Sequence, residues 1–247
     1  MHQEEDTGKS IHEGGTTFLD FNKSGMPLME VVTEPDFQTL EEVTVFAKLL
    51  KQTVEYIGVS DAEMQKGQMR FELNISLRQE KDGTNLPPYR VEVKNIGSIS
   101  ALEKVMQFEI ARQTQLIDAG QELKNETRGL KDMSGETVAQ RSKENEDDYR
   151  YFPDPDLLPL EIPESWIAEV KRALPELPEA MRARFASQFG LTAYDAAAVT
   201  ASREMADYFE ALVARLPSAP KLCANWLTGE VAARLNREQV EIEEVYE

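Results

Sequence analysis

Apolar and polar side chains alternate most regularly along residues 68–79, QMRFELNISLRQ. A period of two predicts a strand with one buried face and one polar face. The polar positions of this strand are Arg70, Glu72, Asn74, Ser76 and Arg78. A second alternating segment, residues 89–95, ends with Lys94 and Asn95 and predicts a neighbouring strand.

Two stretches instead repeat apolar residues with the helical period of about 3.6. Residues 39–58 begin with a capping box of Thr39 and Glu42, and Gly58 favours the end of this helix. The second helix is expected from Ser100, which is paired with Glu103 in a similar box, to about Gly120.

Shorter apolar segments predict further strands. Residues 16–22 and 27–34 are expected to form a hairpin closed by residues 23–26, where Gly25 gives the turn its conformational freedom. Two more strands are expected near residues 126–131 and 135–143.

At about residue 160 the pattern of apolar positions changes from mixed strand and helix to helix alone. Several prolines between residues 153 and 163 indicate a linker, and almost everything beyond them has a helical pattern. We therefore predict an α+β fold with a largely antiparallel sheet in residues 1–160, followed by an all-α helical domain in residues 161–247.

Composition and charge fit a soluble globular chain. Of the 247 residues, 41% are hydrophobic and 29% are charged, and no apolar run approaches the roughly 20 residues that a membrane span requires. The single cysteine, Cys223, excludes an internal disulfide and is expected to be a buried structural thiol. The net charge of −18 is unusual for a protein that binds nucleic acid by itself, so a contact with RNA would be local, metal-assisted or made by another chain.

The first residues, MHQEEDTGKSIHEGG, contain a Gly-Lys-Ser sequence at residues 8–10. A phosphate-binding Walker loop needs another glycine five positions earlier, where this chain has Gln3, so that interpretation is excluded. Glu30 interrupts an apolar segment, and an ionised carboxylate is costly to bury there unless it is paired or bound to metal. Two interpretations remain open: Glu30 lies on an open sheet face, or it shares a Mg²⁺ site with an N-terminal carboxylate.

The polar face of residues 68–79 also has two interpretations. Charged side chains of both signs lie along one sheet face, which suits a cavity that holds a charged substrate during phosphoryl transfer. An ordinary salt-bridged surface has the same composition. Arg150 lies in DDYRYFPDPD, either a rigid site loop or an edge of the core. The sequence holds no arrangement typical of a covalent serine or cysteine nucleophile.

Several segments together resemble a known family. They are HQEEDTGKSIHEGG, DFNKSGMPLMEVVTEPD, IGVSDAEM, RFELNISLR, EVKNIGSI, ETRG, DDYRYFPDPDLLPL and PELPEAMRARF, and they span nearly the whole chain. In this order they are similar to the B subunits of the aspartyl/glutamyl-tRNA(Asn/Gln) amidotransferases.

The resemblance implies a catalytic cradle similar to the glutamine synthetase fold, followed by a helical domain and a tail domain. It implies an enzyme, a ligase that phosphorylates the side-chain carboxylate of misacylated Glu-tRNA(Gln) or Asp-tRNA(Asn) with ATP and Mg²⁺. Ammonia that the amidase, or A, subunit releases from glutamine then displaces the phosphate, and the small C subunit clamps the heterotrimer. The cell compartment expected is the bacterial cytoplasm, or an organelle matrix.

Site residues follow from the resemblance by motif. Glu5 and Glu30 match metal ligands and are expected within about 8 Å of one another, close enough for one hydrated Mg²⁺ or Mn²⁺ ion to link them. The polar cavity is assigned to Arg70, Glu72, Asn74, Lys94 and Asn95, and the ATP contacts are assigned to Lys9 and Arg150.

The chain also departs from the family pattern. An N-terminal strand carrying a Gly-Leu-Glu-x-His motif and the C-terminal tail domain are absent, and Phe71 and Glu72 replace an expected Cys-Asp pair. We therefore expect this stretch to be inactive alone. Two other functions remain to be weighed against a catalytic one: a scaffold that only docks the amidase and tRNA, and a ligase for free small molecules.

Overall fold

The computed structural model describes residues 1–247 except residues 80–82, 84, 132–133, 143–158, 241 and 243–247. By its contacts the chain divides into two compact units, Met1–Thr39 and Leu40–Glu247. The predicted domain boundary near residue 160 lies inside the second unit and stays a prediction. None of the described helices combines the length and the apolarity that crossing a membrane would require.

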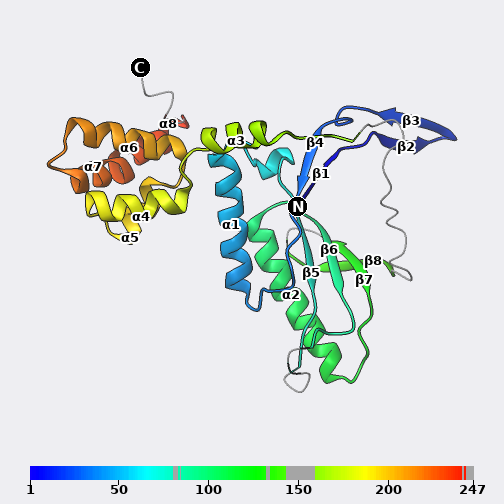
Figure 1. Ribbon diagram of the computed structural model, residues 1–247. Coiled ribbons are helices and arrows are strands. Elements are labelled where there is room, and N and C mark those ends of the chain that lie inside the picture. Colours follow the sequence, from blue (N-terminus) through cyan, green and yellow to red (C-terminus); the bar gives the residue numbers. More distant parts are fainter. Residues whose placement is uncertain (80–82, 84, 132–133, 143–158, 241, 243–247) are drawn as a thin grey trace. The chain divides into compact units, whose positions relative to one another are not determined.

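The first unit consists of two antiparallel ladders of short strands (Figure 1). β1 (His2–Glu5) pairs with β4 (Pro27–Glu30), and β2 (Lys9–Glu13) pairs with β3 (Thr16–Asp20). None of the described side chains in this unit is buried.

The tight hairpin of this unit is the one between β2 and β3. Gly14 and Gly15 connect these strands with φ angles of 55° and 81°, and two successive positive φ angles match the twist of a two-residue hairpin. The hairpin predicted between residues 16–22 and 27–34 is therefore wrong. Gly25, with φ of 78°, instead donates its N–H to the carbonyl of Asp6 at 2.9 Å, and this closes the longer connection that leads to β4.

The second unit begins with a sheet and two helices. The elements are α1 (Leu40–Tyr56), a 3₁₀ turn (Met64–Lys66), β5 (Phe71–Ile75), β6 (Val91–Ile96), α2 (Ile99–Asp118), β7 (Glu126–Leu130) and β8 (Thr137–Ser142). The sheet order is β5-β6-β7-β8, antiparallel except for the parallel β6–β7 pair that α2 connects. The alternation of residues 68–79 thus becomes a shorter strand than predicted, whereas the strands near 126–131 and 135–143 are confirmed.

One face of this sheet is covered by α2, which itself packs against α1 (Figure 1). The buried apolar residues of this layer are Ala47, Leu73, Tyr89, Val91, Val93, Ile96, Leu102, Val105 and Met106. Ser98 caps α2, since its hydroxyl accepts the N–H of Ala101 at 3.0 Å. The helix therefore begins before the predicted Ser100.

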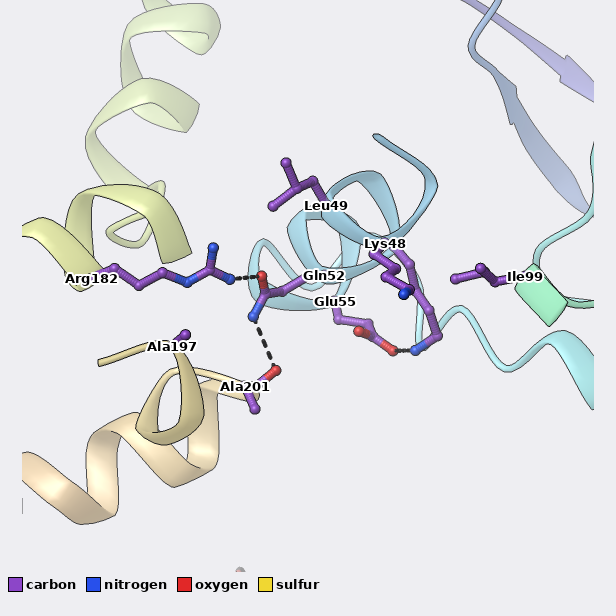
Figure 2. Close-up of a pocket in the computed structure, with 9 residues that line it drawn as sticks. Lys48, Leu49, Gln52, Glu55, Ile99, Arg182, Ala197 and Ala201 are labelled. Carbon is purple, nitrogen blue, oxygen red and sulfur yellow. Dashed lines mark hydrogen bonds and ion pairs between the residues drawn. The ribbon is translucent and has the colours of Figure 1, made fainter. Parts of the chain in front are cut away.

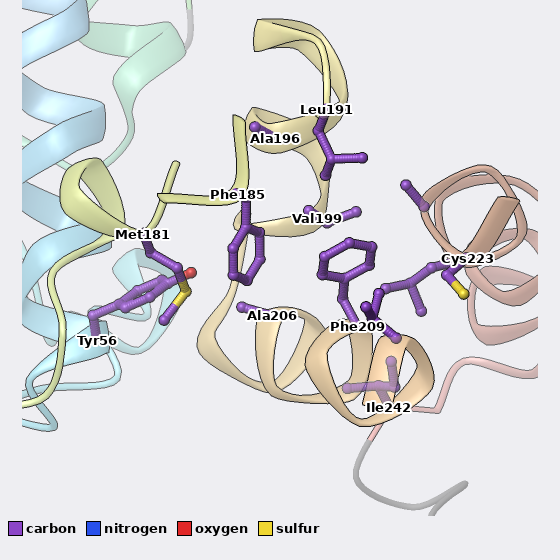
Figure 3. Packing of buried hydrophobic residues seen from close by; sticks show 13 residues of the cluster. Tyr56, Met181, Phe185, Leu191, Ala196, Val199, Ala206, Phe209, Cys223 and Ile242 are labelled. Carbon is purple, nitrogen blue, oxygen red and sulfur yellow. The ribbon is translucent and has the colours of Figure 1, made fainter. Parts of the chain in front are cut away.

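The regular elements described after residue 158 are all helical, as predicted. They are α3 (Glu164–Ala173), α4 (Pro178–Phe189), α5 (Ala193–Val199), α6 (Arg203–Arg215), α7 (Pro220–Trp226), a π-helical turn (Leu227–Val231) and α8 (Ala232–Glu238). Figure 3 shows their core, in which the Phe185 and Phe209 rings lie 5.0 Å apart and Cys223 is buried, as expected. Tyr56 of α1 belongs to this core.

Candidate functional site

The two predicted metal ligands, Glu5 and Glu30, lie on paired strands. In the β1–β4 ladder Glu5 is opposite Pro27, and Glu30 is opposite His2. Directly opposite residues share a face and neighbours along a strand alternate, so Glu5 and Glu30 lie on opposite faces, about 10 Å apart along the strands. The expectation that these two carboxylates approach each other is wrong for this register.

Glu4 is the carboxylate that shares a face with Glu30. It is opposite Leu28, two positions from Glu30, and such diagonal neighbours are about 7–8 Å apart at Cα, within reach of long side chains. Glu30 is exposed, which favours the open-face interpretation over a buried charge. Among the described residues, no group of three or more histidine, cysteine or acidic side chains is arranged to hold a metal ion.

Four of the predicted cavity residues, Glu72, Asn74, Lys94 and Asn95, lie on the sheet face away from α2, which is here called the polar face. Lys94 of β6 is central: its Nζ lies 3.2 Å from Oε2 of Glu72 on β5 and 3.3 Å from Oε1 of Glu92. The second oxygen of Glu92 accepts the hydroxyl of Thr127 on β7 at 3.1 Å. The residues of the polar face are Glu72, Asn74, Glu92, Lys94, Asn95 and Thr127.

A β-bulge brings Asn95 to the polar face. Phe71 pairs with Ile96 and Leu73 with Val93, so the single residue Glu72 is opposite both Lys94 and Asn95. Asn95 takes a left-handed φ of 62°, a conformation that asparagine tolerates better than most residues. Ile96 returns to the core, fully buried, while Asn95 is exposed.

The charge of Lys94 is fixed by its neighbours. Burial by itself lowers the pKa of this amine, but the hydrogen bonds and charges of Glu72 and Glu92 outweigh that effect and raise it above its ordinary value. Lys94 is therefore an ammonium at neutral pH. It can bind an anionic oxygen, but it cannot act as a general base.

A buried polar network supports this sheet from the side of α2. Glu109, with no exposed side-chain surface, accepts hydrogen bonds from Arg112 at 2.8 Å and Gln113 at 3.0 Å, and pairs with Arg128 of β7 at 3.1 Å. The hydroxyl of Thr137 on β8 donates to the same carboxylate. Burial alone raises the pKa of Glu109, but these donors together hold it below its ordinary value.

Sequence reasoning missed this network, although the sequence contains a signal. Glu109 and Gln113 follow Val105 and Met106 at intervals of three, four and seven or eight positions, so they belong to the stripe that α2 turns toward the sheet. A glutamate in such a stripe needs a buried cation, and the two arginines provide it. Arg128 belongs to the ETRG segment, for which the resemblance implies no specific role.

The remaining predicted residues are not brought to the polar face. Arg70 is exposed and precedes β5. Lys9 is opposite Asp20 in the β2–β3 ladder of the first unit. Arg150 lies outside the described residues.

Comparison with known proteins gives a consistent family. Residues 1–168 match the model of the GatB/GatE catalytic domain. A protein of Nitrosospira multiformis, named as the B subunit of an aspartyl/glutamyl-tRNA(Asn/Gln) amidotransferase, is 48% identical over 239 residues, 96% of this chain and 48% of that protein. Proteins of the same name from Burkholderia pseudomallei and Burkholderia lata are 48% and 47% identical, over 98% and 99% of this chain and 50% of each relative.

The chain thus spans about half the length of the curated relatives it matches. The family model covers β1 to β8, with every polar-face residue among them, as well as the β1–β4 ladder. The chain belongs to the GatB/GatE catalytic-domain family.

Proposed function

We propose that this chain is part of an amidotransferase subunit that converts misacylated Glu-tRNA(Gln) or Asp-tRNA(Asn) into the amidated form, a ligase reaction driven by ATP. The observation that carries the proposal is the polar face, where a lysine ammonium lies between two carboxylates inside the segment that matches the family. The glutamine synthetase-like cradle and a separate helical domain are parts of the same proposal.

The polar face supplies the binding groups that this chemistry needs. The Lys94 ammonium would hold the anionic oxygen of the acyl phosphate, and the amides of Asn74 and Asn95 would donate to it. Glu72 is half-exposed, so its carboxylate would accept an N–H of incoming ammonia. Arg70 is proposed to approach the phosphate from the strand end.

Carboxylate oxygens are the ligands that Mg²⁺ prefers, and Glu4 with Glu30 are the pair that one face of the β1–β4 ladder makes available. We propose this pair, in place of Glu5 with Glu30, as the protein's contribution to a Mg²⁺ site. The ion, when bound, would offset the charge of the transferred phosphate. Lys9 and Arg150 stay proposed ATP contacts.

The proposed partners are the amidase, which supplies ammonia, and a third, small polypeptide, together in a heterotrimer. The relatives are bacterial proteins, and we propose the cytoplasm as the compartment. The second candidate function is a scaffold that docks the amidase and tRNA without catalysing, and the exposed apolar side chains of the first unit, such as Phe18 and Phe21 (54% and 64% exposed), favour it.

The test uses the full-length protein in complex with its amidase and small partners. Lys94→Met should abolish transfer of the γ-phosphate of ATP to Glu-tRNA(Gln) while glutamine hydrolysis stays measurable. The matched control is Lys124→Met, since Lys124 is exposed and lies on a loop away from the polar face. Unchanged amidation by Lys94→Met would refute the catalytic role and favour the scaffold.

A further inference from the structure

A pocket of about 360 Å³ lies between α1 and the helices that follow α3, away from the polar face (Figure 2). Its lining residues are Lys48, Leu49, Lys51, Gln52, Glu55, Ile99, Arg182, Ala197 and Ala201. Three of them are cationic and one is a carboxylate, in a chain whose net charge is −18.

Arg182 of α4 is held firmly at this pocket. Its Nε donates to the hydroxyl of Thr200 at 3.2 Å, and its Nη2 donates to the side-chain oxygen of Gln52 on α1. The amide nitrogen of Gln52 in turn donates to the carbonyls of Thr200 and Ala201 at 2.7 and 3.1 Å, as Figure 2 shows for Ala201. These bonds orient the guanidinium group, and both of these partners are neutral.

No carboxylate pairs with Arg182 in the part of the chain that the structure describes. The same holds for the exposed Lys48, whereas the lone carboxylate of the lining, Glu55, is already paired with Lys51. Two cations of this pocket thus have no acidic partner among the described residues, and this leaves both available to an anionic ligand.

We propose that this pocket binds an oxyanion of phosphate chemistry. The Arg182 guanidinium is half-buried and already oriented, so it loses little side-chain entropy when it donates hydrogen bonds to a tetrahedral anion. The spacing of its N–H donors matches that of phosphate oxygens. Lys48 adds a second, adjustable donor at the rim. The pocket is open, so it accepts either free phosphate or a phosphodiester group of a larger ligand.

The experiment is a titration of this chain with inorganic phosphate at constant ionic strength, with chloride as the balancing anion. The Arg182 Nε–H and Gln52 side-chain amide resonances are followed by NMR. We expect saturable shifts with a low-millimolar dissociation constant. Lys48→Gln should weaken phosphate binding about two- to fivefold, the range for one exposed charge, and should leave the Arg182–Gln52–Thr200 contacts in place.

Lys124→Gln removes the charge of another exposed lysine and serves as the matched control, with unchanged phosphate affinity. A short single-stranded oligonucleotide that displaces phosphate would identify a phosphodiester as the source, and an oligonucleotide without effect would identify the free ion. Absence of saturable shifts, or equal weakening by Lys48→Gln and Lys124→Gln, would overturn the proposal. The titration requires no amidotransferase activity, so its failure is separate from failure of the proposed function.

Discussion

Because of the β-bulge at Asn95, we expect the substitution of asparagine by valine to destabilise the sheet at this position but not at Asn74. Asn95 has φ of 62°, a region where a β-branched side chain is strained by about 1–3 kcal/mol. Asn95→Val should therefore destabilise the β5–β6 pair by about 2 kcal/mol. Asn95→Gly keeps the left-handed conformation without that strain, so it should change stability by less than about 0.5 kcal/mol.

Asn74 provides the matched control. It is also an exposed asparagine on the polar face, and it is not among the described residues with positive φ. Valine is enriched in regular strands, so Asn74→Val should be neutral or slightly stabilising. The contrast between the two valine variants isolates the backbone effect from the loss of an amide.

Hydrogen exchange of the β5 and β6 amides is the suitable assay, because it measures the opening of this sheet without assuming that the whole chain unfolds in one step. A loss of about 2 kcal/mol corresponds to roughly 30-fold faster exchange where opening is at equilibrium. Equal exchange rates in Asn95→Val and Asn74→Val would refute the reasoning from the bulge.

Three further outcomes are expected. Glu109→Gln should cost about 3 kcal/mol in urea unfolding because it removes a buried carboxylate and leaves Arg112 and Arg128 to share the single carboxylate of Glu126. Glu136→Gln, at an exposed pair, should cost less than about 1 kcal/mol. The fold lowers the pKa of Glu109, so the ionised carboxylate contributes its full stabilisation to the folded state above its unfolded pKa of about 4.3. This contribution is lost as the pH falls through the folded pKa, and Glu109→Gln should remove it from the acid-side dependence of the unfolding free energy. Phe185→Ala should cost about 3–5 kcal/mol by opening a cavity, and Leu222→Ala, at a residue 53% exposed, less than about 1 kcal/mol in the same measurement.

Local patterns in the sequence determined most of the elements. The period of two predicted β5 and β6, and the helical period predicted α1 and α2. Both periods were readable because apolar side chains recur at the positions that share the buried face of an element. The change of pattern near residue 160 likewise predicted the helices that follow. The polar face was predicted for the same reason: a strand with one apolar face has only one face left for Glu72, Asn74 and Lys94.

Strand pairing was decided by the tertiary structure. Two segments close in sequence, β3 and β4, were expected to pair, but each joins an earlier strand because Gly14 and Gly15 form the tighter turn. Register then assigned the faces. Because the side-chain period is two, an odd offset puts Glu5 on the opposite face from Glu30, and no local pattern reveals that offset.

The buried charges and the bulge also depended on contacts between distant segments. Glu109 acquires its ion pair with Arg128 only when α2 crosses from β6 to β7, 19 positions along the chain from the glutamate. Asn95 leaves the regular alternation only because Ile96 must reach the core opposite Phe71. The sequence by itself thus determined which side of each element is apolar. The partner of each strand and of each buried charge followed from packing between distant segments, because the burial of many side chains outweighs the conformational preference of any short segment.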